Sequence, residues 1–106
     1  MLLQAGDLVW VVLTDREFHR RNDTAIVCPI TSNKAPWPSK VVLPDGLAAR
    51  GAILVDQIRM LDRTQRGFRS VGRVPEEVLN EVRAKLAALL GINFMAFERG
   101  SNEPRQ

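Results

Sequence analysis

The stretch RVPEEVLNEVRAKLAALLG, residues 73–91, decides the fold class of this chain, because the hydrophobic period changes where it begins. From Val78 to Leu90 the apolar residues recur every three or four positions, which is the spacing of one face of an α-helix. Pro75 and the two glutamates after it are typical of a helix start, because the acids face the positive end of the helix dipole. Gly91 is typical of a helix end. The stretch therefore predicts an amphipathic helix that ends at Gly91.

Before this helix the chain has the pattern of short β-strands. Runs of β-branched and other apolar residues are separated by glycine, proline, asparagine or aspartate, as expected of strands joined by turns. The polar residues 15–23 predict a turn or a short helix. The expected strands are residues 8–13 (buried on both faces), 24–30, 40–43, 51–60 and 68–74. Short strands followed by one helix predict a small α+β domain built on a strongly bent sheet or a barrel.

Length and composition are those of a single globular domain. The chain has 106 residues, of which 45% are hydrophobic and 25% charged, enough to bury about two-thirds of the surface that the unfolded chain exposes. A single cysteine argues against a disulfide-stapled secreted scaffold and indicates a reducing compartment. No apolar stretch is long enough to span a bilayer, and the first residues do not resemble an export signal. We therefore expect a soluble intracellular protein.

Positive charge is concentrated in one segment. The whole chain has a net charge of +3, whereas residues 59–73 alone carry +4, from five arginines and Asp62. The planar guanidinium group suits bidentate contact with phosphate, so this segment is either a solvated surface or a binding site for a polyanion. The five residues are Arg59, Arg63, Arg66, Arg69 and Arg73.

Most searches for catalytic motifs are negative. The chain has no glycine-rich phosphate loop, no HExxH and no paired cysteines, so neither a nucleotide fold nor a zinc site is indicated. His19, the only histidine, is either a solvated loop residue or a catalytic one. Trp10 and Cys28 lie in apolar runs and are expected in the core. Trp37, between two prolines in a polar loop, either stacks on a base or anchors the loop.

Two short polar clusters remain as candidates. Thr31, Ser32 and Asn33 follow a predicted strand directly, where their polar groups either donate to a phosphate oxygen or cap a turn. Asp56 and Gln57 interrupt an apolar strand, where an unpaired carboxylate would be costly. We therefore expect this second cluster to be hydrogen-bonded or to line a site.

In this order, the pieces resemble the MazF/PemK-type toxins, endoribonucleases of bacterial type II toxin–antitoxin modules. The resemblance covers Gly6 to Gly91. The matching pieces are Gly6 to Trp10, Val11 to Thr14 leading to Phe18, Ala25 to Ser32, Gly51 to Arg59, Asp62 to Gly67, and Gly72 to Pro75 at the helix start. Residues 1–91 are accordingly expected to form the toxin domain, and residues 92–106 a partly disordered tail.

The resemblance implies a small SH3-like β-barrel with a C-terminal amphipathic helix, working as a homodimer in the cytoplasm. The family cleaves single-stranded RNA, including mRNA, at short sequence motifs without a metal or other cofactor. The 2′-hydroxyl of the RNA attacks the adjacent phosphate and leaves a cyclic phosphate and a 5′-hydroxyl. This chemistry needs a base, donors or positive charge for the phosphorane oxygens, and a proton for the leaving oxygen. A cognate antitoxin with an acidic, disordered segment is expected to fold across the basic groove, and no membrane partner is expected.

The resemblance also implies roles for individual residues. Thr31 matches the family's catalytic threonine, which donates a hydrogen bond to the transition state. Asp56 matches a carboxylate that helps cleavage or RNA binding in some members. The residues expected to contact RNA are Ser32, Asn33, Trp37, Gln57, Arg59, Arg66 and Arg69.

The chain departs from the family in one place. In the family, the opening strand leads into a long loop with an Arg-Pro pair, and that arginine is the other main catalytic residue. Here Trp10 joins directly to Val11, so the loop and its arginine are absent. Two strands with a connection of zero length cannot both form, because even an antiparallel pair needs a two-residue turn. We favour a loop omitted from the sequence over an inactive form of the toxin or a substitute arginine nearby.

This departure leaves two alternatives to the nuclease. One is a non-catalytic module on the same scaffold that binds RNA or an antitoxin. The other is a gyrase-poisoning toxin, which shares the scaffold but is disfavoured by the match around Thr31 and Ser32.

Overall fold

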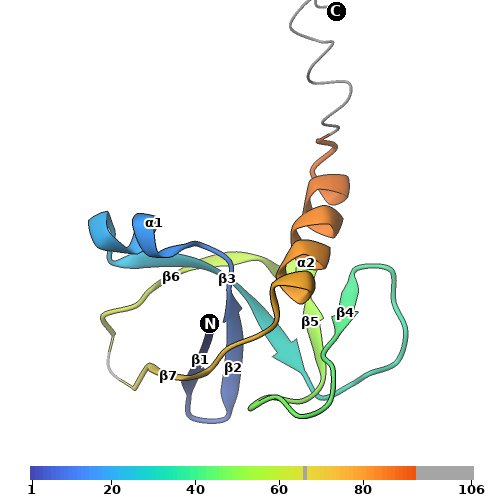
Figure 1. The fold of residues 1–106 in the computed structure, drawn as a ribbon, viewed down its shortest axis with the longest axis horizontal. Coiled ribbons are helices and arrows are strands. Elements are labelled where there is room, and N and C mark those ends of the chain that lie inside the picture. Colours follow the sequence, from blue (N-terminus) through green and yellow to red (C-terminus); the bar gives the residue numbers. More distant parts are fainter. Residues whose placement is uncertain (66, 93–106) are drawn as a thin grey trace, which may run out of the picture.

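Seven strands and two α-helices follow one another along residues 1–65 and 67–92, the part of the chain that the computed structural model describes (Figure 1). In chain order they are β1 (Leu2–Ala5), β2 (Leu8–Val12), α1 (Arg16–Arg21), β3 (Thr24–Thr31), β4 (Lys40–Val42), β5 (Ala52–Leu54), the 3₁₀ helix η1 (Val55–Gln57), β6 (Arg59–Asp62), β7 (Arg69–Gly72) and α2 (Glu76–Leu89). The short helix α1 and the C-terminal helix α2 are both as expected. The predicted tail lies outside the described residues, except for Ile92.

The strands form one antiparallel sheet centred on β3. Its order is β4-β5-β3-β2-β1-β7, and β6 pairs with the first half of β3. The second half of β3 pairs with β5, from Ile30 opposite Ile53 to Thr31 opposite Ala52. The α+β class is confirmed. The described strands form an open, bent sheet with β4 and β7 at its two ends, and not the closed barrel that we expected.

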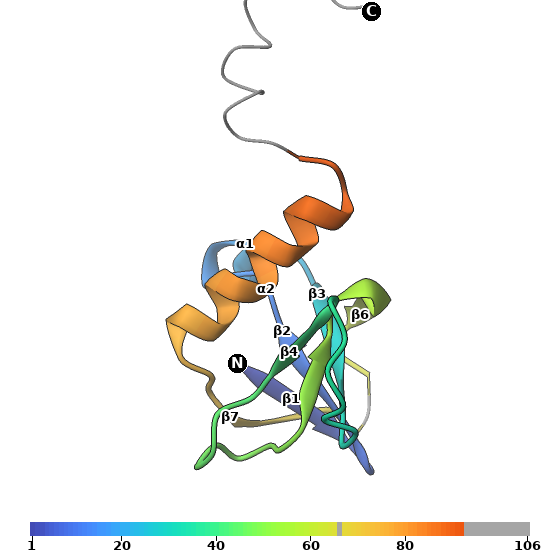
Figure 2. The same cartoon turned by 90° about the vertical axis from the view of Figure 1, so that its right-hand side faces the viewer.

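Side chains from the two faces of the sheet enter two hydrophobic clusters. Helix α2 lies against one face (Figure 2), where its Val78, Leu79 and Val82 join a cluster that includes Cys28. Trp10 lies in the second cluster, where its ring packs edge-on against Phe68 at 5.5 Å between centroids. The core positions predicted for Trp10 and Cys28 are thus confirmed. No helix among the described residues is long and apolar enough to cross a membrane.

The bond between Trp10 and Val11 lies inside a single strand. Strand β2 runs through it and pairs with β1, from Leu8 opposite Ala5 to Val11 opposite Leu2. A tight turn at Gly6 and Asp7 joins the two strands, and Gly6 supplies the positive φ of 61° that this turn requires. Our assignment of residues 8–10 and 11–14 to successive family strands is therefore wrong.

Because β2 runs through the bond between Trp10 and Val11, no loop has to be inserted there for the strands to form. The opening strand is β1, which the sequence analysis missed because it is only four residues long. Both strands of the hairpin form with the two-residue turn that the chain contains. The arginine expected in this connection is nevertheless absent, since the turn is Gly6-Asp7 and β2 begins with Leu8.

The end of β3 is held by a close backbone approach. A Cβ atom placed on Gly51 would lie 1.9 Å from the carbonyl oxygen of Thr31, and the φ of Gly51 is +123°. Only glycine fits this position without movement of the strand. Gly46 also has a positive φ, of +89°, but a Cβ atom placed on it would meet no atom within 4 Å. A substitution at Gly46 therefore measures the cost of the backbone conformation without a steric clash.

We predict that Gly51→Ala lowers the free energy of unfolding by about 2–3 kcal/mol, because it adds a backbone clash to the strain of a positive φ. Gly46→Ala should lower it by only about 1 kcal/mol, the conformational cost alone. Urea unfolding of both variants measures the difference. Equal losses in the two variants would show that the approach to Thr31 does not constrain the fold.

Candidate functional site

Thr31 ends β3, and its side chain organises the start of the loop that follows. Its Oγ1 accepts a hydrogen bond from the backbone N–H of Asn33 at 3.2 Å, and Asn33 Oδ1 accepts one from the N–H of Ala35 at 2.9 Å. The turn-capping role is therefore present. The Thr31 hydroxyl makes one hydrogen bond among the described residues, and its oxygen is the acceptor in that bond. Its O–H therefore remains available to donate to a ligand.

Lys40 fixes the same loop from β4. Its Nζ donates to the carbonyl oxygens of Asn33 at 3.1 Å and Ala35 at 3.2 Å. These bonds hold an ammonium charge beside the loop that Thr31 begins. Sequence reasoning missed Lys40, because a lysine at the start of a strand is common on any surface.

Four of the predicted site residues line one open cavity of about 360 Å³, together with Lys40. They are Asn33, Trp37, Asp56 and Gln57. Trp37 is 64% exposed, so its ring does not anchor the loop in the core. The structure therefore brings residues from two separate clusters to one place.

The setting of Asp56 and Gln57 differs from our expectation. They belong to η1, the 3₁₀ helix that separates β5 from β6, and both are exposed. The predicted single strand over residues 51–60 is wrong, because the backbone turns after Leu54 and Val55 takes the buried position. The Asp56 carboxylate thus faces the cavity and solvent without the cost of burial.

A second cavity, of about 510 Å³, adjoins the first, and Trp37 and Asp56 line both. Its other wall comes from Lys85, Ala88 and Leu89 of α2. Lys85 Nζ donates to the carbonyl oxygen of Pro38 at 2.9 Å and ties the loop to the helix. Trp37 therefore lies between two adjoining cavities, which together extend from the loop after β3 to α2.

The arginine-rich segment does not form one patch with this cavity. Arg59 begins β6, two residues after Gln57, and is exposed. Arg69 lies on β7 at the far end of the sheet, where its guanidinium donates to Gln4 Oε1 at 3.5 Å. Arg63 donates to the carbonyl oxygens of His19 and Asn22 and so has a structural role. Arg66 lies outside the described residues.

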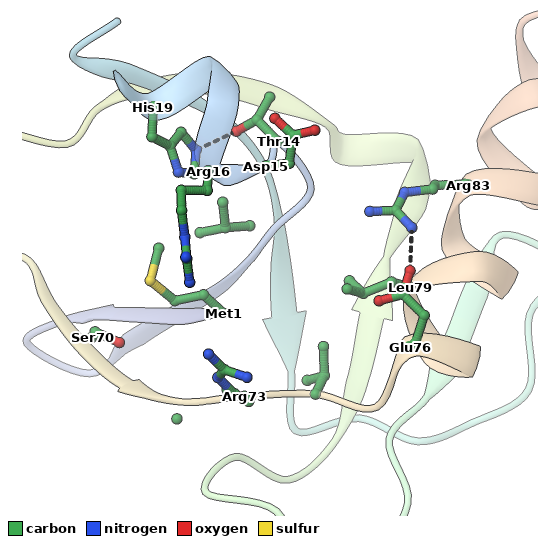
Figure 3. Close-up of a pocket in the computed structure, with 13 residues that line it drawn as sticks. Met1, Thr14, Asp15, Arg16, His19, Ser70, Arg73, Glu76, Leu79 and Arg83 are labelled. Carbon is green, nitrogen blue, oxygen red and sulfur yellow. Dashed lines mark hydrogen bonds and ion pairs between the residues drawn. The ribbon is translucent and has the colours of Figure 1, made fainter. Parts of the chain in front are cut away.

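His19 lies on α1, half-buried, at the edge of another cavity (Figure 3). Its Nε2 is 2.7 Å from Thr14 Oγ1. Burial lowers the pKa of His19 below its ordinary value of 6.5, and the positive charge of Arg63 lowers it further, whereas Asp15 acts in the opposite direction. His19 therefore lies on a short helix and not in a loop, and it remains partly exposed.

Cys28 is not a candidate nucleophile. Burial raises the pKa of its thiol to about 11, and the nearby charge of Asp56 adds to the effect. A thiol with so high a pKa stays protonated and unreactive at neutral pH. No group of three or more His, Cys, Asp or Glu side chains that could hold a metal ion occurs among residues 1–65 and 67–92.

Comparison with known proteins gives consistent matches over most of the chain. Residues 3–90 match the family model described as PemK-like, MazF-like toxin of type II toxin–antitoxin system. The chain is 34% identical over 91 residues to the endoribonuclease PemK of Escherichia coli, and the aligned region covers 82% of this chain and 68% of PemK. It is 31% identical over 88 residues to the endoribonuclease toxin MazF of E. coli K12, with 83% and 78% of the two chains covered.

Solved structures match the fold as well. A crystal structure of MazE–MazF from Deinococcus radiodurans gives a TM-score of 0.81 at 33% identity, over 86% of this chain and 92% of that one. A mycobacterial endoribonuclease gives a TM-score of 0.76 at 18% identity, a likeness of fold alone.

The lowered pKa of His19 predicts how stability changes with pH. The unfolded chain binds a proton at His19 more readily than the folded one, so this residue makes the free energy of unfolding fall as the pH drops through 6.5. Between about pH 7.5 and about pH 5.5, wild-type protein should lose more stability than His19→Gln, which cannot titrate. Urea unfolding at both pH values measures the difference. The same pH dependence in both proteins would contradict the prediction.

Proposed function

Because the chain belongs to the PemK-like, MazF-like toxins of type II toxin–antitoxin systems, we propose that it is an endoribonuclease that cleaves single-stranded RNA, including mRNA, at short sequence motifs. The resemblance found in the sequence is confirmed at the level of the family. One observation carries the proposal. The Thr31 hydroxyl, with its proton available, begins the loop whose Asn33, Trp37 and Lys40 line a cavity with Asp56 and Gln57.

The proposed reaction is attack by the RNA's own 2′-hydroxyl on the adjacent phosphorus, with rupture of the bond to the 5′-oxygen. Asp56, an exposed carboxylate on the cavity, accepts the 2′-hydroxyl proton. Thr31 donates a hydrogen bond to a non-bridging oxygen as negative charge develops there. The departing 5′-oxygen takes a proton from solvent and leaves as a hydroxyl opposite a cyclic phosphate. These steps need no metal ion, as the family resemblance implies.

The cavity also offers a way to hold the substrate. The exposed Trp37 ring presents a face on which a base can stack, an interaction worth about 1–3 kcal/mol per base. Asn33 and Gln57 bring side-chain amides that can pair with base edges. Ser32 and Arg59 are exposed beside the cavity residues and would contact phosphates. Arg69 would contact RNA beyond the cavity, because β7 lies at the far end of the sheet, and Arg66 keeps its assignment from the sequence alone.

The missing arginine limits this mechanism. Strand β2 pairs with β3 with Trp10 opposite Pro29, so β2 begins at the same end of the sheet where β3 finishes at Thr31. The family's arginine is expected just before this strand, where the chain has Asp7 and then Leu8, 62% exposed. Lys40 is the cation that the chain places on the cavity. The absence of arginine favours the second candidate function, a module that binds RNA or an antitoxin without cleavage.

The partners follow from the family. We propose that the protein acts in the cytoplasm as a homodimer and is neutralised by a cognate antitoxin whose acidic, disordered segment binds its basic surfaces. The solved structures that the chain resembles include a MazE–MazF complex, which supports an antitoxin partner.

Cleavage of single-stranded RNA in excess EDTA tests the proposed function. We expect fragments with a cyclic phosphate at one end and a 5′-hydroxyl at the other, because the nucleophile is the RNA's own hydroxyl. Gel analysis of a long mixed-sequence RNA, followed by end-group analysis, detects both products. Folded protein that gives no product above background would contradict the nuclease function, and RNA binding without cleavage would leave the second candidate.

Removal of the Thr31 hydroxyl should slow cleavage by roughly 10²-fold, the usual effect of losing one transition-state hydrogen bond. Thr31→Val removes the hydroxyl at nearly constant volume, and Thr31→Ser should retain most of the rate. Thr24→Val, at the opposite end of β3, is the matched control and should cleave as wild type does. Single-turnover rates at saturating protein measure the effect. A Thr31→Val rate equal to that of the control would remove Thr31 from the mechanism.

A further inference from the structure

The largest cavity described above is separate from the proposed cleavage site. It has a volume of about 590 Å³ and lies between α1, the segment after β7 and the first turns of α2 (Figure 3). Val12 of β2 lines it and pairs with Val27, four residues before Thr31. At about 3.3 Å per residue, this places the cavity roughly 13 Å along the sheet from Thr31.

Two arginines project into this cavity from different elements. Figure 3 shows Arg16 extending from α1 and Arg73 from the segment after β7. The ion pairs among residues 1–65 and 67–92 involve other arginines, namely Arg20 and Arg21 with Glu17, and Arg83 with Glu76. Of the acids on the cavity wall, Glu76 is thus paired, and Asp15 accepts the N–H of Phe18 as the cap of α1. The cavity therefore has an excess of positive charge.

His19 adds an imidazole ring to the same wall. Thr14 Oγ1 accepts the N–H of Ile26 at 3.3 Å and is hydrogen-bonded to His19 Nε2 at 2.7 Å. The second ring nitrogen, Nδ1, takes no part in the bond to Thr14. Ser70 contributes a hydroxyl from β7.

We propose that this cavity binds a backbone phosphate of the RNA strand, at a position away from the cleaved bond. The inference rests on the proposed RNA substrate. Two guanidinium groups, an imidazole and a hydroxyl from three elements line this one cavity, an arrangement that suits a tetrahedral oxyanion with several acceptor oxygens. A carboxylate offers only two oxygens. The volume also exceeds one acidic side chain, and Val12, Val74 and Leu79 provide an apolar wall for the attached sugar or base.

Binding of an uncleavable RNA tests this assignment. The probe is a fluorescent single-stranded oligonucleotide pool of mixed sequence with every ribose 2′-O-methylated, which blocks the attacking hydroxyl. The double variant Arg16→Gln/Arg73→Gln removes both cavity arginines. The control Arg20→Gln/Arg21→Gln removes the same charge from exposed positions of the same chain region. Anisotropy titrations over a range of salt concentrations give affinity and its salt dependence for each protein.

The cavity variant should lose about tenfold in affinity or more at low salt, and the slope of log K against log salt should fall by about 0.7, the value for one lost phosphate contact on a single strand. The control should stay within about twofold of wild type. Equal behaviour of the two variants would overturn the proposal. So would normal RNA binding by the cavity variant together with loss of binding to an acidic antitoxin segment, which would make the cavity a protein-docking site.

His19 provides a second readout, because it is the only histidine in the chain. Its imidazole NMR signals should shift when the uncleavable RNA is added to wild type and should not shift in the cavity variant. Unchanged signals in wild type at saturation would also overturn the proposal. The two hypotheses remain distinguishable, because wild-type protein that binds RNA through this cavity but does not cut it would contradict only the nuclease function.

Discussion

The backbone pairing of β3 with three neighbouring strands is the constraint on which the candidate site depends. One half of β3 bonds to β6, the other half to β5, and β2 runs along its second edge. Thr31 is the last residue in this arrangement, and the carbonyl group that it presents to Gly51 leaves no room for a side chain. Because β3 is paired along both edges and Thr31 itself pairs with Ala52, the sheet sets the position of the Thr31 backbone. The Thr31 hydroxyl in turn accepts the Asn33 N–H of the loop that follows.

The short hairpin of β1 and β2 is sufficient for the sheet, but its turn brings no arginine to the end of the sheet where Thr31 lies. A turn of two residues is enough to reverse the chain, so the fold does not need the long loop that the family resemblance implies. The fold is therefore retained here without the arginine that the family resemblance implies for this connection. A phosphate beside Thr31 would meet the ammonium group of Lys40, which also holds the loop through two carbonyl oxygens.

The sequence was informative where a pattern was long and local. The helical period predicted α2, and the apolar run around Cys28 predicted β3 and its burial. Strand β1 was missed because four residues carry too little alternation to identify a strand. The 3₁₀ turn at Asp56 was also missed, since apolar residues on both sides of it continue the pattern of a strand. The pairing with β4 ends here, with the bond from the Val55 N–H to the Ser39 carbonyl, and the chain then turns.

The positions of the arginine side chains of residues 59–73 in space could not be predicted from the sequence either. Residues 59–73 are a cluster in the sequence, yet alternation along two strands and a turn sends their side chains to different places. Arg63 contacts backbone carbonyls at the end of α1, Arg69 contacts Gln4, and Arg73 lines the cavity with Arg16. Arg16 and Arg73 are far apart in the chain and meet only because β7 returns beside β1. Recognition of a long polyanion depends on such convergence, because each phosphate needs several donors at one point. The two places where donors converge, at Thr31 and at His19, lie toward opposite ends of the β2–β3 pair, so a single strand of RNA that contacts both has to run along this pair.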